Sequence, residues 1–287
     1  MRPKGLKTRI FLDGGDPKET KTIIDTLGFL DGQTTNPTLI SKNPEAKKRI
    51  EQGKKFSEAE ILGFYKDVVN VVSAMIPDGS ISVEVYADPA SLAESMLKQG
   101  REMFSWIPNA HIKFPTTAEG LKAASQAVKE NLRVNMTLCF SQEQAAAVYT
   151  STKGAKRGSV FVSPFIGRLD DRGENGMDLI SHITTMYKKG DGHVEVLTAS
   201  VRSMDHFLYA LKLESDIVTA PFAILKEWGE KGLPLPDADY RYDAKGLKPI
   251  PYKEIDLSKD WQDYDIAHEL TLKGMSRFSD DWNSLIG

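Results

Sequence analysis

Eight short runs of strand-like composition alternate along the chain with longer amphipathic stretches. The runs span residues 9–14, 33–36, 80–87, 111–115, 133–138, 159–168, 193–201 and 216–220. A helix between successive strands is typical of a parallel sheet. Eight such units favour a (β/α)8 barrel, the TIM barrel, in which a ring of strands lies inside a ring of helices. A chain of 287 residues is long enough to build it.

The helical stretches support this order of elements. They cover residues 57–76, 89–105, 118–130, 141–152, 176–189 and 203–213. Several begin with helix start signals, such as Asp88 before Pro89 and Ser141 three residues before Gln144. A doubly wound open sheet is the alternative, but it usually has fewer strands, and no GxGxxG turn follows the first run.

The chain continues beyond the eighth run. Residues 220–231 are predicted to form a helix, 233–257 a long loop rich in Pro, Asp and Tyr, and 261–285 an additional C-terminal helix. The last helix can dock on the barrel or serve as a subunit contact. We expect residues 1–287 to form a single barrel domain.

Side chains alternate between the two faces of a strand, and a barrel strand turns its apolar face towards the surrounding helices. Polar side chains near the strand C-termini therefore point into the barrel, at the end where active sites of this architecture lie. In the run 193–201, this rule places Ser200 inside with Thr198, opposite Leu197. The polar residues expected to converge are Asp13, Asn36, Glu84, Lys113, Asn135, Thr137, Ser163 and Ser200.

Lys113 is the most informative member of this set. A lysine inside a barrel can serve as an amine nucleophile and form a Schiff base with a ketone or aldehyde. Each residue also has a structural explanation: Lys113 can extend its ammonium group to the surface, and Glu84 can be its ion-pair partner. Arg168 and Arg202 can form surface ion pairs. The combination of one amine, two carboxylates and several small polar groups at one end favours catalysis.

Composition excludes several other functions. Lys and Arg number 37 against 40 Asp and Glu, a formal net charge of −3, so neither a nucleic-acid nor a membrane partner is expected. Cys139 is the single cysteine, and the five histidines show no ligand spacing, so neither a metal nor an organic cofactor is expected. Without a signal-like N-terminus or a long apolar run, the chain is expected to be cytoplasmic.

Six segments closely resemble the transaldolase family, in the family's order. They are DGQTTNPTLI (31–40), SVEV (82–85), IKFPTTAEGLKAA (112–124), VNMTLCFSQEQA (134–145), SPFIGRLDD (163–171) and TASVRS (198–203). The segment FSDDW (278–282) also resembles the closing helix of the family. The resemblance implies a class I aldolase barrel that acts on sugar phosphates.

The resemblance also assigns roles to residues. It implies that Lys113 forms the Schiff base, that Asp13 exchanges a proton with the C4 hydroxyl of the substrate, and that Glu84 and Thr137 activate the catalytic water. The implied substrate-binding residues are Thr35, Asn36, Asn135, Ser163 and Phe165, together with Arg168, Ser200 and Arg202 for the phosphate. A homo-oligomer is expected.

Three functions remain to be distinguished. A transaldolase of the non-oxidative pentose phosphate pathway transfers a dihydroxyacetone unit from a ketose phosphate (sedoheptulose 7-phosphate or fructose 6-phosphate) to an aldose phosphate (glyceraldehyde 3-phosphate or erythrose 4-phosphate). A fructose-6-phosphate aldolase releases free dihydroxyacetone instead. Its sequences resemble this chain but carry Gln and Tyr where Glu84 and Phe165 stand, which favours transfer. The third is a barrel that binds sugar phosphates without catalysis.

Overall fold

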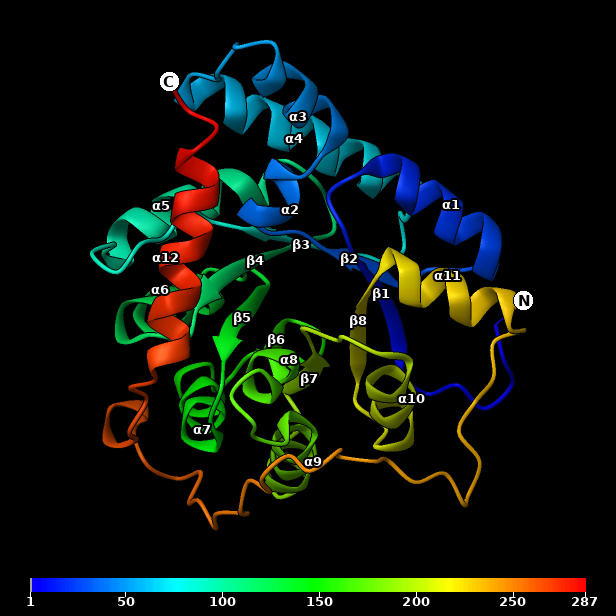
Figure 1. The fold of residues 1–287 in the computed structure, drawn as a ribbon. Coiled ribbons are helices and arrows are strands. Elements are labelled where there is room, and N and C mark those ends of the chain that lie inside the picture. Colours follow the sequence, from blue (N-terminus) through cyan, green and yellow to red (C-terminus); the bar gives the residue numbers. More distant parts are fainter. Residues whose placement is uncertain (1) are drawn as a thin grey trace.

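The computed structural model describes residues 2–287 and has the predicted architecture. Eight parallel strands follow one another around a closed barrel in sequence order, as Figure 1 shows. The chain is therefore a (β/α)8 TIM barrel, and the doubly wound alternative is excluded. The strands are β1 (Arg9–Asp13), β2 (Gly32–Thr34), β3 (Ser80–Glu84), β4 (Ala110–Pro115), β5 (Val134–Cys139), β6 (Val160–Pro164), β7 (Val194–Thr198) and β8 (Ile217–Pro221).

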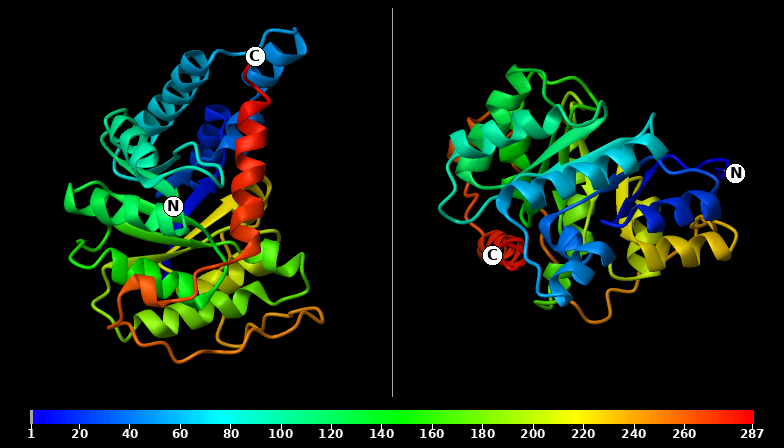
Figure 2. Two further views of the ribbon diagram at one scale, coloured as in Figure 1. Left: turned by 90° about the vertical axis from the view of Figure 1, so that its left-hand side faces the viewer. Right: turned by 90° about the horizontal axis from the view of Figure 1, so that it is seen from above.

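Helices surround the strands and bury the apolar outer face of the barrel (Figure 2). Their bounds are α1 (Pro17–Leu27), α2 (Pro37–Ser41), α3 (Pro44–Glu51), α4 (Glu58–Met75), α5 (Ala93–Phe104), α6 (Ala118–Lys129), α7 (Gln142–Ser151), α8 (Ile166–Asp170), α9 (Gly176–Tyr187), α10 (Met204–Lys212), α11 (Phe222–Glu230) and α12 (Glu269–Asn283), with a 3-10 turn, η1 (Trp261–Asp263). Within residues 2–287, no helix combines the length and the apolar character needed to cross a membrane.

Local sequence signals explain where many of these helices begin. The side chain of Ser57 accepts a hydrogen bond from the backbone of Glu60, whose carboxylate returns the contact, so this capping box starts α4. Asp16 caps α1 just before Pro17, and Gly28 ends the same helix with a left-handed φ of 76°. The sequence analysis did not identify α1, α2 and α3, of which α2 and α3 are short.

The predicted alternation of faces holds on most strands. Lys113 pairs in register with Glu84 on one side and with Asn135 on the other, so these three side chains share the inner face. The prediction for the seventh strand was wrong. Glu195 pairs with the inward Phe161, which makes Leu197 the next inward residue of β7 and turns Thr198 outward. The strand also ends at Thr198, so Ser200 belongs to the loop that follows.

The sixth run is another correction. We predicted a strand over 159–168, but β6 ends at Pro164 and α8 begins at Ile166. The backbone amides of Ile166 and Gly167 donate to the carbonyls of Ala199 and Ser200, at 3.1 Å each. These bonds link α8 to the loop after β7, and Arg168 therefore lies on a helix rather than on a strand.

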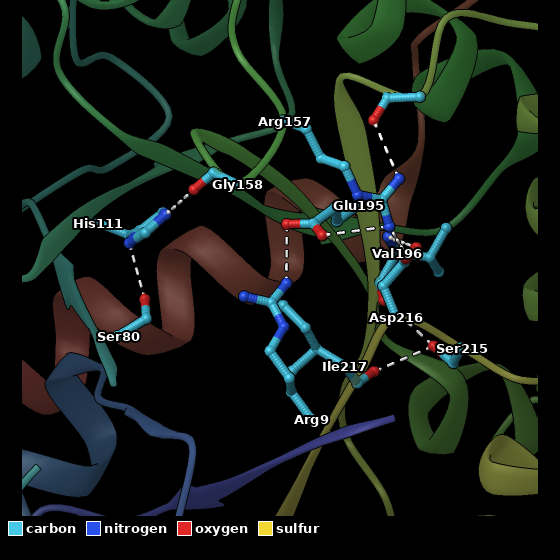
Figure 3. A network of polar contacts seen from close by, with 11 residues as sticks. Arg9, Ser80, His111, Arg157, Gly158, Glu195, Val196, Ser215, Asp216 and Ile217 are labelled. Atoms are coloured by element: carbon cyan, nitrogen blue, oxygen red, sulfur yellow. Dashed lines mark hydrogen bonds and ion pairs between the residues drawn. The ribbon is translucent and has the colours of Figure 1, made fainter. Parts of the chain in front are cut away.

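Charged and polar residues form a network at the N-terminal end of the barrel, and Figure 3 shows their contacts. Glu195 accepts a hydrogen bond from Arg9 at 2.7 Å, and Arg157 lies 3.4 Å from Glu195 and 2.8 Å from Asp216. The His111 ring bonds to Ser80 at 2.7 Å and to the carbonyl of Gly158 at 2.9 Å. Burial lowers the pKa of His111 to about 3, so the ring stays neutral.

The last helix, α12, lies within the predicted range 261–285. It runs from the end of β5 past α2, and the residues after it contact Phe56. Just after its C-terminus, the carbonyl of Leu285 accepts a hydrogen bond from the backbone amide of Phe56 at 2.8 Å. Its beginning is held by Thr271, whose hydroxyl donates to the carbonyl of Leu138 at 2.9 Å. Figure 1 shows α12 in red, passing α2, with which it packs. This course brings α12 to the C-terminal end of the strands.

Candidate active site

A cavity of about 200 Å³ opens at the C-terminal ends of the strands. Eight of the twelve predicted site residues line it. The other four are buried: Thr35 follows β2, Glu84 ends β3, and Asn135 and Thr137 lie within β5. The eight lining residues are Asp13, Asn36, Lys113, Ser163, Phe165, Arg168, Ser200 and Arg202.

Lys113 is held at the base of this cavity by two oxygen atoms. It is only 3% exposed, so its ammonium group does not extend to the surface. Its Nζ lies 2.6 Å from Glu84 Oε2 and donates to the carbonyl of Thr35 at 3.0 Å. The structural alternative for Glu84, an ion pair with a lysine, is thus present in the structure. It also provides a buried carboxylate that can accept a proton from the lysine.

Two carboxyl groups lie near the amine: Glu84, which is buried, and Asp13, which is half-buried and lines the same cavity as Lys113. Burial raises the pKa of Asp13, while Lys113 and the hydrogen bond that Thr34 donates at 2.7 Å act in the opposite direction. Burial likewise raises the pKa of Glu84, against the attraction of Lys113. A carboxyl group whose pKa is raised towards neutrality is suited to accept and return protons.

Small polar groups lie in the cavity wall and directly behind it. Ser163 donates from its hydroxyl to Asn135 Oδ1 at 2.6 Å, and Asn135 donates from Nδ2 to Ser82 at 3.0 Å. Asn36 caps α2 by accepting a hydrogen bond from the backbone of Leu39 at 2.9 Å. The hydroxyl of Thr137 is buried and finds no partner among residues 2–287, so it can still bond to a small molecule.

The outer part of the cavity is cationic. Arg168 stacks between the rings of Phe165 and Phe278, at 5.4 and 5.3 Å from their centroids. Burial lowers the pKa of Arg168, and Arg277 acts in the same direction. Arg202 forms the predicted type of surface ion pair, with Asp171 at 2.9 Å, yet also lines the cavity. This concentration of guanidinium groups suits a phosphate.

The sequence analysis missed two cavity cations, Lys42 and Arg277. Lys42 is the C-cap residue of α2, the helix that begins at Pro37 of the TTNP motif, so its position was a usable signal. Arg277 lies in α12, whose apolar stripe indicated a docked helix without indicating where it docks. Among residues 2–287, no group of three or more His, Cys, Asp or Glu side chains is arranged to hold a metal ion.

Comparison with known proteins agrees with this geometry. Residues 10–287 match the family described as Transaldolase/Fructose-6-phosphate aldolase. The chain belongs to this family. A probable transaldolase of Dehalococcoides mccartyi is 41% identical over 278 residues, which cover 96% of this chain and 99% of that protein. A probable transaldolase of Brucella ovis is 41% identical over 218 residues, which cover 76% and 87%.

Membership in the transaldolase/fructose-6-phosphate aldolase family makes the chain an aldolase-type enzyme of sugar-phosphate chemistry. A solved structure of 3-hexulose-6-phosphate synthase from Salmonella typhimurium aligns with a TM-score of 0.50 and 14% identity. The alignment covers 78% of this chain and 95% of that one. Similarity at this level shows a common barrel fold and carries no information on substrates.

Proposed function

We propose that this protein is a transaldolase, which moves a dihydroxyacetone unit from a ketose phosphate to an aldose phosphate through a Schiff base on Lys113. The observation that carries the proposal is the buried Lys113, with Glu84 Oε2 at 2.6 Å and Asp13 in the same cavity. The names of the relatives in Dehalococcoides and Brucella support the same activity.

The first half of the reaction releases an aldose phosphate. Glu84 accepts the proton of Lys113, and the free amine attacks the C2 carbonyl of the ketose phosphate. Water leaves, and the resulting iminium accepts electrons from the C3–C4 bond. Asp13 takes the proton of the C4 hydroxyl as that bond breaks, and its raised pKa suits this exchange. An aldose phosphate departs, and the dihydroxyacetone enamine stays on Lys113.

The second half reverses these steps with another aldose phosphate. C3 of the enamine attacks the acceptor aldehyde, and Asp13 returns its proton to the new hydroxyl. Water then hydrolyses the iminium. Glu84 and Thr137 hold this water in the proposal, which is supported by the unbonded Thr137 hydroxyl. Asn36, Asn135 and Ser163 bind the dihydroxyacetone hydroxyls, while the hydroxyl of Thr35 is already bonded to Ser82 and Tyr65.

The cationic part of the cavity binds the phosphate in this proposal. Arg168, Ser200 and Arg202 all line it, and planar guanidinium groups can bind two phosphate oxygens at once. The substrates we propose are the ketose and aldose phosphates of the non-oxidative pentose phosphate pathway, with sedoheptulose 7-phosphate or fructose 6-phosphate as the donor.

A fructose-6-phosphate aldolase is the second candidate, because the family includes both activities. Two observations favour transfer: the residue beside Lys113 is the carboxylate Glu84, and Phe165 offers no hydroxyl to the cavity. The test is to supply fructose 6-phosphate with and without erythrose 4-phosphate. We expect sedoheptulose 7-phosphate with the acceptor and little free dihydroxyacetone without it. Rapid release of dihydroxyacetone in the absence of acceptor would establish the aldolase instead.

A further inference from the structure

Tyr65 lies behind the lysine site, on α4, in the layer of helices outside the barrel. Its side chain is fully buried, and its ring packs against Trp106 and against Trp282 of α12, each with ring centroids 5.9 Å apart. Its hydroxyl oxygen lies 2.5 Å from the Thr35 hydroxyl and accepts a hydrogen bond from the Glu84 backbone amide at 2.9 Å. It does not line the cavity, and no step of the reaction described above uses it.

The directions of these hydrogen bonds follow from the number of available protons. The Thr35 hydroxyl donates its one proton to the carbonyl of Ser82, at 2.7 Å. The proton between Tyr65 and Thr35 must therefore come from Tyr65. Burial raises the pKa of Tyr65, so the hydroxyl keeps this proton. The result is a directed chain from the Glu84 amide through Tyr65 and Thr35 to Ser82.

This chain fixes both residues that hold the amine. The carbonyl of Thr35 accepts a hydrogen bond from Lys113 Nζ at 3.0 Å, and Glu84 Oε2 lies 2.6 Å from the same atom. Thr35 follows the end of β2, and Glu84 ends β3. At this strand end the backbone amide of Glu84 donates to the Tyr65 hydroxyl. One hydroxyl thus ties two strand ends together at the point where each contacts Lys113.

We propose that Tyr65 is a positioning residue for the Schiff-base lysine: its hydroxyl aligns Thr35 and Glu84 so that Lys113 is correctly placed for attack. The inference rests on the proposed function, because it needs Lys113 to be the nucleophile. Small displacements of a reacting group carry large rate penalties, since a shift of about 1 Å can cost about 100-fold. Loss of one supporting hydrogen bond, with the ring still in place, should cost about tenfold.

The test compares two tyrosines that each lose one buried hydroxyl. Tyr65→Phe keeps the ring between Trp106 and Trp282. The control is Tyr187→Phe on α9, whose hydroxyl donates to the carbonyl of Ala145 at 2.7 Å and which does not line the cavity. We expect Tyr65→Phe to lower kcat and the rate of borohydride-trapped imine formation about tenfold, with the KM for the ketose phosphate within twofold. Tyr187→Phe should retain the kinetics of the unmodified enzyme.

A double-mutant cycle separates positioning from general destabilisation. Thr35→Val removes the acceptor of the Tyr65 proton, so the combined variant should be little slower than the slower single variant. Unchanged imine formation in Tyr65→Phe, or fully additive losses in the cycle, would overturn the positioning role. Absence of trapped imine in the unmodified enzyme would instead overturn the proposed function, and the two failures are thereby distinguished.

Discussion

Replacing Gly167 with alanine should weaken phosphate recognition without touching the amine site. A Cβ atom at Gly167 would lie 2.4 Å from the carbonyl oxygen of Ser200 and 2.5 Å from Cγ of Arg202. Contacts below 3.0 Å essentially never occur, so the backbones of residue 167 and Ser200 must separate by at least 3.0 − 2.4 = 0.6 Å. A backbone oxygen cannot swing aside as a side chain can. The loop that carries Ser200 and Arg202 therefore shifts away from its present position in the cavity.

The expected loss is that of about one charged hydrogen bond, about 1.5–3 kcal/mol. That corresponds to roughly a 12- to 140-fold higher KM for a phosphorylated acceptor. The assay compares glyceraldehyde 3-phosphate with glyceraldehyde, which lacks the phosphate, at a donor concentration that saturates each variant. Gly167→Ala should weaken only the first, and the control Gly63→Ala, on an open face of α4, should change neither. Equal losses with both acceptors would refute the assignment of this loop to phosphate binding.

Three further predictions concern charge and stability. Glu195→Ala should lower the free energy of unfolding, measured by urea denaturation, by about 1–3 kcal/mol, while kcat of the folded protein stays unchanged. The loss is smaller than for a fully buried ion pair because Arg9 is 33% exposed. A lower kcat would show that the two ends of the barrel are coupled. The folded state raises the pKa of Asp13, so ionisation of this carboxyl group destabilises the fold as pH rises. Asp13→Asn should therefore raise Tm at pH 7, and the difference in Tm should disappear below pH 3.8. An equal or lower Tm at pH 7 would contradict this reasoning. In the pH profile of kcat/KM, the midpoint of the acid limb should lie above pH 3.8, because Asp13 must be ionised to accept a proton. A midpoint at or below pH 3.8 would exclude Asp13 as the base.

The barrel and its lysine could be predicted because both depend on simple periodicity. Glu84 and Lys113 lie on strands whose inner and outer residues alternate clearly in polarity, and Asp13 is the polar residue that ends the apolar run of β1. The same rule failed for β7, because Glu195 and Leu197 both face inward and only the register with Phe161 reveals this. A short helix such as α8 has too few turns to show a helical period, and its sequence reads as a continuation of β6.

Two residues contributed by long helices, Tyr65 of α4 and Arg277 of α12, could not be assigned a role from the sequence. Tyr65 belongs to the apolar stripe of α4, and the sequence does not distinguish it from a tyrosine that only packs in the core. Its role depends on its contacts with Thr35 and Glu84, which only the structure shows. From the sequence, Arg277 is indistinguishable from a surface arginine. It lines the cavity because α12 packs at the C-terminal end of the barrel strands. Both depend on tertiary packing between segments far apart in the chain, which local patterns do not encode.

The central claim, that Lys113 forms the Schiff base, is tested most directly by borohydride trapping. The enzyme is incubated with fructose 6-phosphate, reduced with borohydride and digested, and its peptides are mapped by mass. We predict a reduced dihydroxyacetone or ketose adduct on Lys113, and none in a Lys113→Met variant that keeps its fold. An unmodified Lys113, or an adduct on a different lysine, would contradict the account.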